Sequence, residues 1–81
     1  MTDDDDKALA EEIIAAVSPI GEMKSLVDSI WGAGEWPDAA VLALVHMSDI
    51  NLDIDRRLIA HAIAAWPERM GEALIEELQA I

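Results

Sequence analysis

Residues 39–45 have the sequence Ala-Ala-Val-Leu-Ala-Leu-Val, the longest uninterrupted apolar run in a chain of 81 residues. A run without polar residues is expected to be buried nearly all round. Its alanines, and the length of the segment that contains it, favour a central helix, although a short apolar run is also compatible with a buried strand. Pro37 suits the first position of a helix. We therefore expect a helix over residues 37–47 at the centre of the fold.

Four further segments carry apolar residues at helical spacing and are separated by prolines, glycines or polar residues. Thr2 is the expected N-cap of the first helix, and Ser18-Pro19 the expected start of the second. The sequence thus predicts an all-α fold, a compact bundle of five short helices that forms a single domain over residues 1–81. The five helices are expected at about residues 3–17, 19–31, 37–47, 53–65 and 67–80.

Residues 49–55 alternate polar and apolar side chains, which is the period of a half-buried strand. A lone strand could pair only with a second copy of itself in a dimer. The other interpretation is a loop in which Asn51 or Asp53 caps the fourth helix. Oxygen-bearing residues at alternate positions are also typical of calcium-binding loops, but Ile54 and Ala60 stand where such a loop needs glycine and glutamate. We therefore predict no specific calcium site, and weak cation association stays open.

Each proline is followed seven residues later by a leucine and a β-branched residue. We interpret this pattern as a recurring helix start and not as a repeat array, because the prolines are unevenly spaced. Both residues of each pair are expected on the core face of their helix. The pairs are Leu26-Val27, Leu44-Val45 and Leu74-Ile75.

The chain has 17 acidic and five basic residues, a formal net charge of −12, although 53% of its residues are hydrophobic. Such a charge opposes binding to nucleic acid and to anionic membranes and favours a protein partner with a basic surface. Cysteine is absent, which excludes disulfides and thiolate metal sites. The amino terminus is acidic, unlike a secretory signal, and no apolar run approaches the ~20 residues that span a bilayer. We expect a cytoplasmic protein.

The aspartates of residues 3–6 fall in the first turn of the first expected helix, where the helix dipole favours negative charge. With Lys7 they are identical to the enterokinase recognition sequence. The helical pattern continues beyond them without a break, so we take them as native.

The three tryptophans are the only aromatic residues. Trp66 lies between two expected helices, and both Trp66 and Trp31 are expected in the core. Trp36 stands beside Glu35 and Asp38, and we expect it to be partly exposed as an interface anchor.

No motif identifies a catalytic residue, a cofactor or a metal site. His46 has Asp49 one helical turn away, and with His61 the three could bind zinc only if the helices brought them together. Asp28-Ser29-Ile30 is similar to the Asp-Ser-Leu site of acyl carrier proteins, but the serine of that family opens a helix and Ser29 is expected near the end of one. The chain also resembles the colicin immunity proteins in size, acidity and helix content, without the tyrosine pair that anchors their partner.

The sequence therefore predicts a non-enzymatic acidic protein-interaction module, for example an inhibitor or DNA mimic that binds a basic, nucleic-acid-handling protein. Small acidic proteins of phages and mobile elements supply the analogy. Two alternatives stay open: an oligomerising structural or regulatory domain that forms a homodimer, and a small carrier or metal-binding protein. The residues expected at the protein-binding face are Asp3, Asp4, Asp5, Asp6, Glu11, Glu12, Glu22, Asp28 and Trp36.

Overall fold

The computed structural model describes residues 3–50 and 52–80, and within them the chain forms five helices and no strand. The predicted all-α bundle is confirmed. No helix among the described residues combines the length and apolar character needed to cross a membrane. The helices are α1 (Asp3–Val17), α2 (Gly21–Gly32), α3 (Trp36–Asp49), α4 (Arg56–Ala65) and α5 (Pro67–Gln79).

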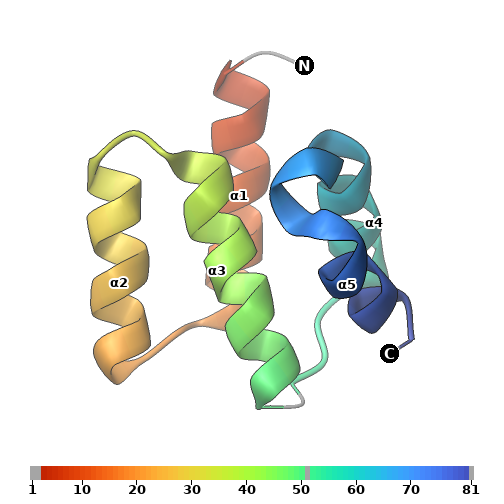
Figure 1. Cartoon of the computed structure of the whole chain (residues 1–81). Helices are drawn as coiled ribbons and strands as arrows, with labels where there is room; N and C mark the ends of the chain where they lie inside the picture. Colours follow the sequence, from red (N-terminus) through yellow and green to blue (C-terminus); the bar gives the residue numbers. More distant parts are fainter. Residues whose placement is uncertain (1–2, 51, 81) are drawn as a thin grey trace.

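Helix α3 is the centre of the bundle, as its apolar run predicts. It packs against α1, α2 and α5, while α4 packs against α1 and α5. Figure 1 shows α2 on one side of α3 and the pair α4 and α5 on the other, with α1 behind. Ala39, Ala40 and Ala43 of α3 are fully buried, together with Leu44 and Met47. Because alanine side chains are small, the neighbouring helices can pack closely against α3.

The expectation that residues 39–45 are buried all round is wrong. Val45 is 36% exposed, because one face of α3 has no helix over it. Adjacent residues on a helix point about 100° apart, so one member of a Leu-Val pair faces the core while the other turns away. The same geometry leaves Leu26 53% exposed while its neighbour Val27 is buried.

Helix α2 begins at Gly21 and not at Pro19, because Ser18 belongs to the end of α1. The Ser18 backbone N–H donates to Ile14 O, and its hydroxyl donates to Ala15 O. With a positive φ of 50°, Ser18 closes α1 and satisfies two carbonyls that the helix end leaves free. Ile20 then precedes α2 without a side-chain cap.

Helix α4 begins at Arg56 instead of residue 53, and its N-cap is Asp55, whose carboxylate accepts the Arg57 backbone N–H at 2.9 Å. The prediction that Asp53 caps α4 is wrong. The predictions for Asn51 and for Thr2 as caps lie outside the described residues. The alternating pattern has a different cause: Leu52 and Ile54 turn towards the core from a loop, while Asp53 and Asp55 face solvent.

Helix α5 is kinked at Gly71, which the sequence pattern did not predict. Gly71 has φ 77° and ψ 159°, a conformation open mainly to glycine. The kink separates the turn that carries Met70 from the longer segment that carries Leu78, and both side chains still reach the core.

The three tryptophans lie at helix ends: Trp31 in the last turn of α2, Trp36 at the start of α3 and Trp66 directly before α5. Trp66 is buried, as predicted, and its indole N–H donates to the Asp6 carboxylate at 3.1 Å. Trp31 and Trp36 are both half-buried, so Trp31, expected in the core, packs against the core cluster without being fully enclosed by it. Their ring centroids are 6.2 Å apart, and the Lys7 ammonium lies 5.3 Å from the Trp36 ring centroid.

An ion pair joins α3 to α5 at the same end of the bundle. Arg69 donates to the Asp38 carboxylate at 2.7 Å, and both side chains are roughly half exposed. The hydrogen bond to Asp38 and the attraction of that carboxylate raise the pKa of Arg69 above its ordinary value. The pair links the start of α3 to the first turn of α5 at the surface.

Candidate functional site

The residues predicted for an acidic binding face do not form one surface. Helices α1 and α2 are antiparallel in Figure 1, so the start of α1 and the start of α2 lie at opposite ends of the bundle. Asp4, Asp5 and Asp6 are therefore remote from Glu22. Glu12 points about 100° away from Glu11 around α1. The side chain of Asp3 lies outside the described part of the chain.

Asp6 has a structural contact instead of a free carboxylate. It is half-buried and accepts the indole N–H of Trp66, a residue 60 positions further along the chain. Its contribution to a binding face is reduced, because a partner would have to compete with this hydrogen bond.

Trp36 is half-buried and contacts both Lys7 and Trp31. A projecting interface anchor would leave its ring accessible, whereas one face of this ring is covered by an ammonium group. Trp31, by contrast, reaches a hollow on the surface.

Glu11 and Asp28 are the two predicted residues that the fold brings together. They line one groove between α1 and α2, with a volume of about 350 Å³. The groove exists because α1 and α2 both pack on α3 and, within the described residues, make no helix-to-helix contact with each other. Its apolar lining consists of Ile14, Ala15, Val27 and Trp31.

The α1–α2 groove combines an apolar lining with a carboxylate on each helix. Such a site suits a lysine or arginine side chain, whose methylene stem covers apolar surface while its charged head reaches a carboxylate. The half-buried Trp31 ring adds a face to which a cation is attracted.

Asp28 already has a basic neighbour. Lys24 lies one helical turn before it, with its ammonium 3.7 Å from the carboxylate and both side chains about two-thirds exposed. Exposed pairs of this kind contribute little, on the order of 0.3–0.5 kcal/mol. An incoming cation can therefore displace Lys24 at small cost.

The sequence did not identify the apolar residues of the groove, because Ile14, Val27 and Trp31 carry the helical pattern of a core. A local signal was present. Glu11 with Ile14, and Asp28 with Trp31, stand three residues apart, which places acidic and apolar side chains on the same edge of each helix.

The histidine and serine candidates do not form a reactive site. His46 is half-buried on α3 and His61 is exposed on α4, two helices that do not pack against each other in the described part of the chain. Within residues 3–50 and 52–80, no three His, Cys, Asp or Glu side chains are grouped to hold a metal ion. Ser29 is exposed in the last turn of α2 and not at a helix start.

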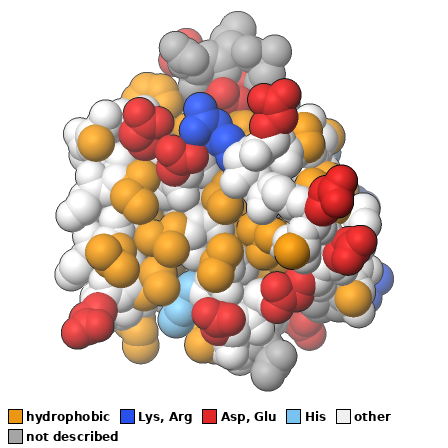
Figure 2. Space-filling model, viewed as in Figure 1, with side chains coloured by type: hydrophobic (Ala, Val, Ile, Leu, Met, Phe, Trp, Pro, Cys, Tyr) orange, Lys and Arg blue, Asp and Glu red, His pale blue; other side chains and the backbone are white. Residues whose placement is uncertain are grey.

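The fold and the α1–α2 groove define a small acidic all-α protein with a mixed apolar and acidic surface groove. Figure 2 shows acidic side chains spread over the visible face, with hydrophobic side chains gathered over α2 and α3. No protein-family model, curated protein or solved structure matches this chain.

Proposed function

We propose that the protein is a non-enzymatic interaction module whose α1–α2 groove receives a basic side chain from a partner protein. The observation that carries this proposal is the pair Glu11 and Asp28, which face one apolar groove from two helices. The proposed partner has a basic surface, for example that of a nucleic-acid-handling protein that this module inhibits. A cytoplasmic setting is part of the proposal and accords with a chain that has no cysteine.

The size of the α1–α2 groove favours a side chain over a whole small ligand. Its volume of about 350 Å³ is at the lower limit of small-molecule sites, which span roughly 300–1,000 Å³. Charge then provides specificity and fast association, because the chain as a whole attracts basic surfaces and the groove selects one contact.

The test uses a defined probe, an amphipathic helical peptide with leucines on one face and two arginines beside them. We expect the indole N–H signal of Trp31 to shift in NMR spectra on titration, while that of the buried Trp66 stays fixed. The variant Glu11→Gln with Asp28→Asn should weaken binding about fivefold to tenfold, since each exposed charge contact contributes up to about 1 kcal/mol.

A matched control keeps the change in net charge and moves it elsewhere. Glu72→Gln with Glu76→Gln removes two exposed carboxylates from α5, far from the groove. We expect it to bind the peptide almost as well as the wild type. Equal weakening by both double variants, or equal binding of a peptide with glutamate in place of arginine, would contradict the proposal.

A homodimer is the second candidate, and exposed apolar side chains favour it. Ile20, Leu26, Val45 and Ile50 are 77%, 53%, 36% and 52% exposed, and all lie on α2, on α3 or directly beside these helices. Figure 2 shows hydrophobic side chains gathered over α2 and α3, and such exposed apolar patches are typical of protein contact surfaces.

Sedimentation at two salt concentrations tests the dimer. Two copies with a charge of −12 each repel one another, and salt screens that repulsion. A dimer held by this apolar face should therefore be stronger in about 0.5 M salt than in about 0.05 M salt and should be lost in Leu26→Lys. A monomer at high protein concentration and high salt would exclude this candidate.

A further inference from the structure

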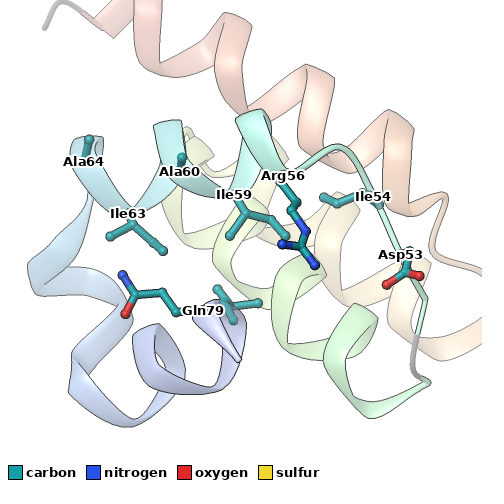
Figure 3. A pocket seen from close by; sticks show the side chains of 9 residues that line it. Asp53, Ile54, Arg56, Ile59, Ala60, Ile63, Ala64 and Gln79 are labelled. Carbon is teal, nitrogen blue, oxygen red and sulfur yellow. The ribbon is translucent and has the colours of Figure 1, made fainter. Parts of the chain in front are cut away.

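A second and larger groove lies in the C-terminal part of the chain, between α4 and the end of α5. Its volume is about 610 Å³. Most of its lining is apolar and comes from both helices and the loop before α4, with Ile54, Ile59, Ile63 and Leu78 as the large side chains (Figure 3). Two small residues, Ala60 and Ala64, leave room on the α4 wall.

One cationic side chain is placed in this α4–α5 groove. Arg56 lines it, and Figure 3 shows the guanidinium projecting from the first turn of α4 over the hollow, next to Ile59. Arg56 forms no ion pair within the described part of the chain, whereas Lys24 and Arg69 each pair with an aspartate. Among the described residues, Arg56 is therefore a guanidinium without an ion-pair partner that lines an apolar groove.

We propose that the α4–α5 groove binds a small anionic amphiphile, a molecule with one carboxylate head and a hydrocarbon body. The body would cover the isoleucines and Leu78, and the head would accept hydrogen bonds from Arg56. The volume lies within the range of small-molecule sites, and an apolar lining with few polar groups is typical of them. This binding is separate from the α1–α2 groove and does not depend on it.

Asp53 also lines the groove, and its negative charge should affect the affinity for an anionic ligand in the opposite direction to Arg56. Figure 3 places Asp53 beyond Arg56, on the side away from Ile63 and Gln79, so the head of the ligand reaches Arg56 before it approaches this carboxylate. Asp53 repels an anionic head and Arg56 attracts it. Removal of the two charges must therefore change the affinity in opposite directions.

The experiment titrates the isotopically labelled protein with decanoate and, separately, with decyltrimethylammonium, each below its critical micelle concentration. We expect decanoate to shift the methyl signals of Ile59 and Ile63 and to bind about tenfold more tightly than the cation. The net charge of −12 by itself predicts the reverse order. A preference for decyltrimethylammonium, or no methyl shift with either probe, would overturn the proposal.

Four variants locate the site. Arg56→Gln should weaken decanoate binding about tenfold, since hydrogen bonds to a charged group are the stronger ones. The adjacent Arg57→Gln is the matched control, because it changes the net charge equally while Arg57 does not line the groove. Asp53→Asn should tighten binding, and Ala60→Leu should abolish it by filling the hollow.

Circular dichroism first establishes that each variant is folded, which is expected because Asp53, Arg56, Arg57 and Ala60 are all exposed. Equal weakening by Arg56→Gln and Arg57→Gln would mean that overall charge controls the binding, and the proposed site would be wrong. Unchanged affinity in Ala60→Leu would equally place the amphiphile elsewhere.

Discussion

Leu44→Ala is expected to remove a large share of the protein's free energy of unfolding. Leu44 is fully buried at the centre of α3, where α1, α2 and α5 meet it. Loss of a buried leucine side chain costs roughly 2–5 kcal/mol, because apolar contacts are lost and a cavity remains. A domain of 81 residues has a total stability on the order of 4–12 kcal/mol. Urea denaturation followed by circular dichroism measures the change.

Leu26→Ala is the matched control for this prediction, since the same atoms are removed from a helix position that is 53% exposed. We expect a change below about 0.5 kcal/mol. The two variants remove the same atoms from leucines that each stand seven residues after a proline. A difference in their free energies of unfolding therefore reports the difference in burial. Similar costs for the two variants would contradict the arrangement of α2 and α3.

Trp66→Ala should have the second large effect, a loss of roughly 3–5 kcal/mol. Trp66 is 4% exposed, stands between α4 and α5, and ties them to α1 through Asp6. Trp36→Ala, at the half-buried tryptophan beside Lys7, should cost clearly less. Thermal unfolding gives the order, and an equal or larger cost at Trp36 would show that the core tryptophan is misassigned.

The hydrogen bond itself can be measured with a double-mutant cycle of Trp66→Phe and Asp6→Ala. Phenylalanine keeps most of the apolar ring and removes the indole N–H, so the coupling free energy reports the bond and should be about 1 kcal/mol. The parallel cycle with Asp4→Ala, an exposed aspartate in the same helical turn, should give a coupling near zero. Equal coupling in both cycles would indicate a general charge effect of the first turn.

The fold class could be predicted from the sequence because apolar spacing is a local property. Five segments with helical periodicity, separated by proline, glycine or polar residues, are enough to predict five helices. Helix starts were less predictable. Ser18 could equally cap α2 or close α1, and only the path of the chain between these helices decides which carbonyl its hydroxyl reaches. The kink at Gly71 likewise depends on how α5 meets its neighbours.

The candidate site was predictable only in part. Glu11 and Asp28 were among the expected binding residues, but six other carboxylates were grouped with them on charge alone. Charge does not reveal direction: Asp6 turns inward to Trp66, while Glu12 and Glu22 lie away from the groove. Arg56 was not expected at any site, because its role depends on the hollow that α4 and α5 enclose.

By itself, the sequence determined that this chain is acidic, lacks cysteine and folds as helices around the apolar run at residues 39–45. Those properties follow from composition and from contacts between residues three or four positions apart, which need no knowledge of the rest of the chain. Only the tertiary structure decided that Asp6 is bound by Trp66, that Trp31 stays half-buried and where two grooves open. These features arise between helices that are distant in sequence, so no local pattern records them.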